Sequence, residues 1–135
     1  MKKFFSVLAI SILIVCLFTA AAPLPTTTFT LVQGLPETMN VGETHTVIVQ
    51  VESDQQFISA QALPSFQYPG KGVVAVQGGS RSGSGTSATL AITYLAKSST
   101  ERMENGVAPV RFVVGVRYVG GYVVVQDYTF YVAVP

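Results

Sequence analysis

The segment that decides the fold runs from residue 110 to residue 134 and reads VRFVVGVRYVGGYVVVQDYTFYVAV. On both sides of Gly120-Gly121, β-branched and aromatic residues recur at the two-residue period of an extended strand. Two adjacent glycines accept the positive φ angles that a tight hairpin turn requires. The segment therefore predicts an antiparallel hairpin with strands over residues 110–119 and 122–134.

Both faces of this hairpin carry apolar residues. A sheet of a two-layer sandwich turns only one face toward the core, so the other face is either ordinary protein surface or a contact surface for a partner. Both interpretations stay open from the sequence. For a partner surface the candidate contact residues are Arg111, Arg117 and Tyr131.

The chain beyond Pro25 is rich in Val, Thr, Tyr, Phe and Gly, with turn signals every 8 to 12 residues. Residues 44–53 alternate most clearly, with His45, Val47, Val49 and Val51 on one face. Seven strands are expected in total, which favours an all-β, seven-stranded immunoglobulin-like β-sandwich over a closed barrel. In chain order the seven expected strands cover residues 27–33, 44–53, 57–63, 73–77, 86–96, 110–119 and 122–134.

Two connections are expected between these strands. Residues 78–85 read GGSRSGSG, which predicts a mobile loop whose tip, with Arg81, is a further candidate contact for a partner. Ser98 and Glu101 have the spacing of a capping box, and Asn105-Gly106 would end the turn. We therefore expect a short helical crossover between the two sheets over residues 98–105.

The run VGETHTVIVQV at residues 41–51, followed by the Tyr- and Val-rich closing hairpin, resembles the Ig-like modules of bacterial and archaeal surface-layer and cell-adhesion proteins. The resemblance covers most of the chain after the N-terminal segment and implies a role in adhesion or envelope structure. The chain departs from antibody-type domains because it contains no tryptophan and no cysteine pair. Tyr118 also stands at the end of its strand, where a tyrosine corner would stand near the start.

The N-terminus has the order of a secretory signal peptide. Lys2 and Lys3 precede the apolar residues 4–18, and small residues follow, so residues 1–21 are expected to form a hydrophobic signal helix cleaved after Ala21. Two alternatives stay open: residues 4–22 are long enough to remain as a membrane anchor, and Cys16 could be acylated as in a lipoprotein. Each alternative predicts an extracytoplasmic location, either secreted, periplasmic or at the cell surface.

Residues 22–135 form one domain in this interpretation. They contain no cysteine, so no disulfide or thiolate metal site is expected. They carry six basic and seven acidic residues, a net charge of −1. This balance argues against nucleic acid as a partner and against membrane contact other than through the N-terminal segment.

The sequence predicts neither an enzyme nor a cofactor site. His45 is the one histidine, and no Gly-x-Ser-x-Gly elbow accompanies it. The acidic residues lack the spacing of a calcium loop, and neither glycine-rich stretch leads into a helix as a phosphate loop would, so no catalytic, cofactor or metal residue is assigned.

The expected function is therefore non-enzymatic: adhesion, envelope structure or protein–protein interaction, with another protein or copies of the chain itself as partner. One alternative is a surface-filament subunit assembled by strand exchange, because the strand at residues 26–32 and the C-terminal strand are both suited to pairing with a neighbour. The alternative of another class is a carbohydrate-binding or enzymatic domain. A sugar-binding domain would use the exposed rings of Tyr68, Tyr94 or Tyr122.

Overall fold

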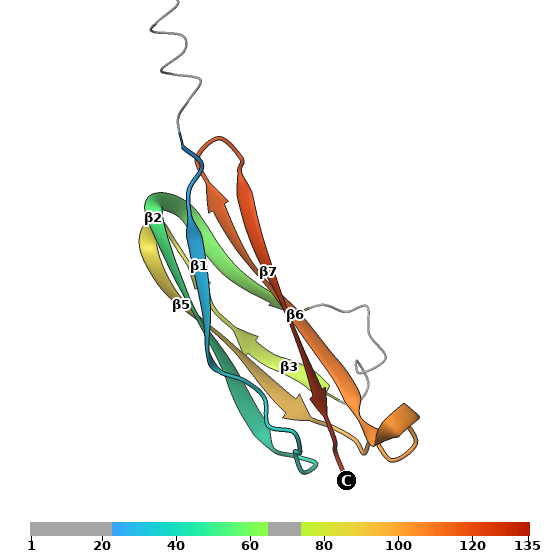
Figure 1. The fold of residues 1–135 in the computed structure, drawn as a ribbon. Coiled ribbons are helices and arrows are strands. Elements are labelled where there is room, and N and C mark those ends of the chain that lie inside the picture. Colours follow the sequence, from blue (N-terminus) through green and yellow to red (C-terminus); the bar gives the residue numbers. More distant parts are fainter. Residues whose placement is uncertain (1–22, 65–73) are drawn as a thin grey trace, which may run out of the picture.

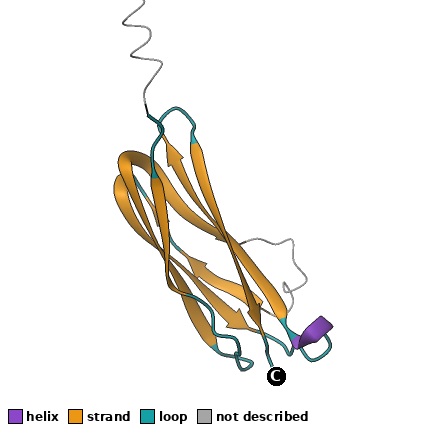
Figure 2. Cartoon of the chain, in the orientation of Figure 1, coloured by secondary structure: helices purple, strands orange, loops and turns teal. Residues whose placement is uncertain are grey.

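A computed structural model describes residues 23–64 and 74–135, which form β-strands and one short 3-10 turn (Figures 1 and 2). This part of the chain contains no helix long and apolar enough to cross a membrane. The expected signal helix over residues 1–21, with Cys16, and also Tyr68, lie outside the described residues. The elements are β1 (Thr27–Gln33), β2 (Thr44–Pro64), β3 (Val74–Gly79), β4 (Arg81–Ser82), β5 (Gly85–Ala96), η2 (Glu104–Gly106), β6 (Ala108–Tyr118) and β7 (Val123–Val132).

Strand β2 is 21 residues long and belongs to both layers of the fold. Its first half pairs with β5 through Glu52, Phe57 pairs with both Gly85 of β5 and Tyr118 of β6, and the residues that follow pair with β6. The β2–β5 register shifts between Glu52 and Phe57, and beyond Phe57 strand β6 replaces β5 as the partner of β2. The two strands expected over residues 44–53 and 57–63 are therefore one bent strand. The intervening Ser-Asp-Gln-Gln contains neither Gly nor Pro, so the backbone stays extended and bends without a turn.

The bend folds the hydrogen-bonded strands into two facing layers. One layer has the order β1-β2-β5-β3 and the other the order β4-β2-β6-β7. Near the edges, Thr38 forms a parallel bridge to Ala133, and the Met39 amide donates to the Ala133 carbonyl over 2.9 Å. The all-β class is confirmed, although the division into strands differs from the expected one.

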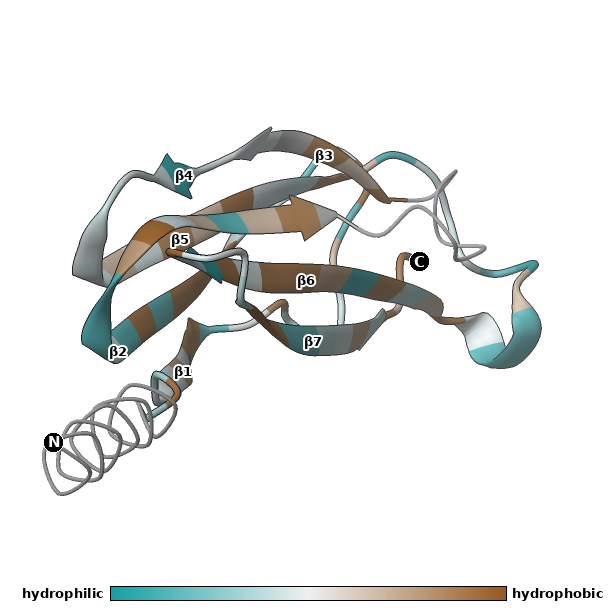
Figure 3. Cartoon of the chain, turned by 90° about the horizontal axis from the view of Figure 1, so that it is seen from above, coloured by the Kyte–Doolittle hydropathy of each residue, from teal (hydrophilic) through white to brown (hydrophobic). Residues whose placement is uncertain are grey.

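The core lies between the two layers. Figure 3 shows apolar and polar residues alternating along much of β2 and β6. The predicted alternation is confirmed in β2, where Val47, Val49 and Val51 are at most 1% exposed, and throughout β6. Burying side chains of this size contributes about 1.5–3 kcal/mol each. The buried residues of β6 are Ala108, Val110, Phe112, Val114, Val116 and Tyr118.

The expected mobile loop over residues 78–85 is wrong. Gly78 and Gly79 close β3, Arg81 and Ser82 form β4 against β2, and β5 begins at Gly85. Ser80 joins this stretch to β5 because its amide donates to the Ala91 carbonyl over 2.9 Å and its hydroxyl accepts from the Ala91 amide over 2.7 Å. Backbone pairing with the neighbouring strands orders this Gly- and Ser-rich segment, although its side chains cannot form a core by themselves.

The expected helix over residues 98–105 is also wrong, since this segment contains only the turn η2. Asn105 and Gly106 have φ angles of 57° and 66°, so they end the helical turn as the sequence predicted. The buried Thr100 fixes the segment instead. Its hydroxyl accepts a hydrogen bond from the Val134 amide, at the C-terminal end of the chain, and donates one to the Gly106 carbonyl. These long-range bonds replace the local bonds of a helix.

Candidate interaction face

The hairpin β6–β7 is formed as predicted. Its turn contains Gly120 and Gly121 with φ angles of 89° and 88°, and the Tyr118 amide donates to the Tyr122 carbonyl over 2.8 Å. The pairing runs from Ala108 opposite Val132 to Arg117 opposite Val123 without a register shift. A regular hairpin of this length fixes which residues point away from the core.

The outward residues of β6, β7 and the adjoining half of β2 form one continuous surface, here called the hairpin face. It is unusually apolar for a surface, with Leu63, Val123, Val125 and Tyr131 exposed by 49%, 50%, 56% and 64%. The strand register fixes its composition. Its members are Ser59, Gln61, Leu63, Pro109, Arg111, Val113, Gly115, Arg117, Val123, Val125, Asp127, Thr129 and Tyr131.

The four contact residues expected from the sequence all lie on or beside this face. Arg111 and Arg117 lie on β6 and Tyr131 on β7. Arg81 pairs with Gln61 of β2, so its side chain leaves the sheet on the same side. Arg117 lies at the end next to the hairpin turn and Tyr131 at the opposite end, so the four residues share a face without forming a single cluster.

The middle of the hairpin face holds an ion pair. Arg111 Nη2 donates to Asp127 Oδ2 over 2.7 Å, with side-chain exposures of 26% and 52%. A partly exposed pair of this kind contributes about 0–1 kcal/mol to stability. Its main effect is to neutralise the centre of the face, which leaves charge at the two ends.

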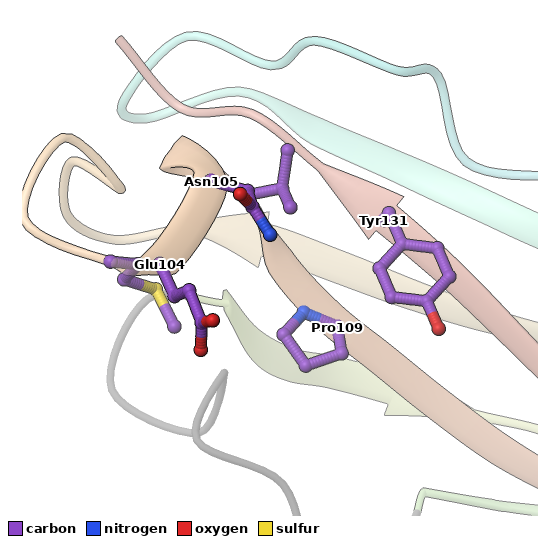
Figure 4. A pocket seen from close by; sticks show the side chains of 6 residues that line it. Glu104, Asn105, Pro109 and Tyr131 are labelled. Carbon is purple, nitrogen blue, oxygen red and sulfur yellow. The ribbon is translucent and has the colours of Figure 1, made fainter.

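An open pocket of about 430 Å³ adjoins the Tyr131 end of the face. Figure 4 shows Glu104, Asn105, Pro109 and Tyr131 around it, contributed by η2, β6 and β7. Apolar walls, an aromatic ring and one carboxylate suit an aliphatic stem that ends in a cation. Sequence reasoning missed this pocket because it assigned residues 98–105 to a helix. The lining residues are Met103, Glu104, Asn105, Val107, Pro109 and Tyr131.

His45 lies at the start of β2, far along the chain from the hairpin. Its Nε2 is 3.4 Å from Glu43 Oε2, and Glu43 Oε1 also accepts a bond from Asn40 Nδ2 over 2.7 Å. The Asn40 bond, with a smaller contribution from His45, lowers the pKa of the Glu43 carboxyl below its ordinary value. Across residues 23–64 and 74–135, no three His, Cys, Asp or Glu side chains are grouped so that they could hold a metal ion.

The tyrosines considered for sugar stacking are placed differently from one another. Tyr94 is 2% exposed, so it cannot serve as a stacking platform, and that expectation is wrong. Tyr122 is 40% exposed but its ring lies 6.0 Å from that of Tyr118, at the hairpin turn.

Both strands considered for exchange with a neighbour are paired within the chain. Strand β1 pairs with β2 from Thr27 opposite Ser53 onward. The end of the chain bonds to residues 37–39, and the Val134 amide donates to the Thr100 hydroxyl over 2.8 Å. Strand exchange would therefore have to replace pairings that the single chain already makes.

No protein-family model matches this chain, and no curated protein matches it either. Among solved structures it is similar to that of murine CRIg, with 12% sequence identity over 84% of this chain and 99% of that chain. The TM-score is 0.31, a level at which the similarity assigns neither family nor function. The architecture rests on the strand pairings given above.

Proposed function

We propose that this chain is an exported, non-enzymatic Ig-like module that binds a protein partner through the hairpin face, in adhesion or in the structure of a cell envelope. The observation that carries the proposal is the exposure of Leu63, Val123, Val125 and Tyr131 on one continuous sheet face. A surface of this kind costs solubility unless a partner covers it.

The composition of the face favours a protein over a small molecule. Tyrosine and arginine are enriched in protein interfaces, and both stand here among branched apolar residues. The pocket beside Tyr131 is open and lies at one end of the hairpin face, which suits a single side chain of a protein partner.

Export rests on the N-terminal sequence. Lys2-Lys3, the apolar run over residues 4–18 and the small residues that follow support a secretory segment cleaved after Ala21. Retention as an anchor or acylation at Cys16 would change the tether but leave the same domain outside the cytoplasm. The described chain begins near the turn of the β6–β7 hairpin and ends at the opposite end of the sandwich (Figure 1).

A filament subunit joined by strand exchange is less favoured. Its two donor candidates are β1 and the C-terminal strand, and both are paired within the chain. The hairpin face, in contrast, needs no rearrangement before a partner can bind.

Site-specific photo-crosslinking tests the proposal. A photoreactive amino acid at Val125 should give a covalent adduct with another protein molecule in the producing cell. The matched control is Thr89, an exposed residue of β5 in the other layer, which should give none. Absence of an adduct from Val125, or equal adducts from both positions, would contradict a specific interaction face.

A further inference from the structure

We infer that the partner of the hairpin face is a second copy of this chain, docked face to face with its strands antiparallel to those of the first. In this dimer Arg117 of each copy enters the pocket beside Glu104 of the other. The inference rests on the proposed function and names its partner.

The charges at the two ends of the face are opposite. Arg117 lies at the end next to the hairpin turn, and Arg81 leaves the sheet on the same side nearby. In the part of the chain that the structure describes, no carboxylate lies within 4.0 Å of Arg117. The other end carries Glu104, and the neighbouring Glu101 and Arg102 offset each other. An antiparallel pair therefore brings unlike charges together at both ends.

The spacing along β6 fits this arrangement. Arg117 and Pro109, a wall of the pocket, are eight residues apart in one strand, or about 26 Å at roughly 3.3 Å per residue. A two-fold axis that crosses β6 between Arg111 and Val113 places Arg117 over the partner's pocket. Because Asp127 is opposite Val113 in the register, the same axis places Arg111 beside the partner's Asp127 as well as its own.

The shapes of the two faces also complement each other. The axis sets Val125 against the Tyr131 ring of the other copy, an apolar contact made twice. It sets Gly115 against the other copy's Pro109, and a Cβ built on Gly115 meets no atom within 4 Å. The Pro109 ring of one copy therefore faces the open space above Gly115 of the other, and the two-fold axis repeats this contact.

The size of the face indicates a weak dimer. Three strands about 4.8 Å apart and about 26 Å long cover roughly 370 Å² of flat area. A standard interface buries about 800 Å² on each partner, so this dimer belongs to the weak class. The two exposed Arg117–Glu104 ion pairs fix the relative orientation of the two copies and make the dimer sensitive to salt.

The antiparallel arrangement has a consequence for adhesion. In each copy the described chain enters β1 at the end of the sandwich that carries the hairpin turn (Figure 1), so the starts of the two β1 strands lie at opposite ends of the dimer. Chains anchored through their N-terminal segments would then join two facing surfaces, whereas cleaved chains would form a free dimer.

Sedimentation measurements on the chain recovered after export test the inference. If the recovered chain retains residues 1–21, the measurements are made in detergent. Wild type should dimerise with rising concentration up to about 1 mM, and salt should weaken the dimer. R117E and E104R should each raise the dissociation constant at least about tenfold, because two attractive pairs become repulsive. The matched controls K97E and E52R change charge at exposed positions away from the hairpin face and should leave the constant unchanged.

The decisive measurement is an equimolar mixture of R117E and E104R. Each contact in the mixed dimer then joins opposite charges again, so association should return to within about threefold of wild type. A wild-type chain that stays monomeric, or a dimer that the reversals do not weaken, overturns the inference. A Val125 adduct with a different protein would overturn it too, while leaving the proposed interaction function intact.

Discussion

The Tyr118 hydroxyl donates a hydrogen bond to Ser53 Oγ over 2.7 Å and so joins the last buried residue of β6 to the bend of β2. The Thr27 hydroxyl lies 2.6 Å from the Tyr118 hydroxyl oxygen and can donate a hydrogen bond to it. The Tyr118 and Phe57 rings form a T-shaped pair with their centroids 6.5 Å apart. One side chain thus connects β1, β2 and β6 at the end of the sandwich that carries the hairpin turn.

Replacing Tyr118 with phenylalanine should lower the free energy of unfolding by about 1–3 kcal/mol, because Ser53 and Thr27 lose a shared partner while the ring is kept. Urea denaturation measures the change. Tyr122→Phe, at an exposed position of the hairpin turn, is the control and should stay within about 0.5 kcal/mol of wild type. Equal losses in the two variants would show that the hydroxyl of Tyr118 has no special role.

Thr100 is the one buried polar residue of the described chain, and Thr100→Val should destabilise it by about 1–3 kcal/mol. The substitution keeps the shape but removes the hydroxyl that donates to the Gly106 carbonyl over 2.7 Å and accepts from the Val134 amide over 2.8 Å. Faster amide exchange at Val134 would locate the loss. Thr89→Val, on the surface of β5, should have little effect, and an unchanged Val134 amide would contradict the assignment.

Periodicity predicted the parts of the fold that depend on local pattern. The buried residues of β6 and the outward positions of Arg111 and Arg117 follow from a two-residue period and a glycine turn, and both are found in the structure. The continuity of β2 does not follow from pattern. It depends on β5 and β6, which pair with successive halves of the same strand.

The same limit applies to the pocket beside the hairpin face. Its position depends on the path of residues 101–107, which is fixed by the bonds of Thr100 to the chain end 34 residues later. Ser98 and Glu101 have the spacing of a helix cap, and no local signal indicates that a long-range contact prevails there. The glycine-rich stretch at residues 78–85 is similar, since strands β2 and β5 order it.

Tyr94→Phe should stabilise the protein by about 1 kcal/mol. The Tyr94 hydroxyl is buried and has no hydrogen-bond partner within the described part of the chain, so its removal relieves a desolvation cost. Burial raises the pKa of this hydroxyl above its ordinary value, so the wild-type side chain is neutral in the fold. Thermal unfolding near neutral pH measures the gain. A clear loss of stability would show that the hydroxyl is hydrogen-bonded in solution.

The Glu43 carboxyl should make the free energy of unfolding depend on pH in the acid range. Its carboxylate accepts a bond from Asn40 Nδ2 over 2.7 Å and lies 3.4 Å from His45 Nε2, and these contacts hold its pKa below the ordinary value of 4.5. Because the pKa is lower in the folded than in the unfolded chain, the stabilisation is present above about pH 4.5 and is lost as the pH falls through the folded value. Asn40→Ala removes the largest cause, so the Glu43 carboxyl, followed by NMR, should titrate at higher pH in this variant. Glu43→Gln should remove this share of the acid dependence, and an Asn40→Ala titration curve that matches wild type would contradict the mechanism.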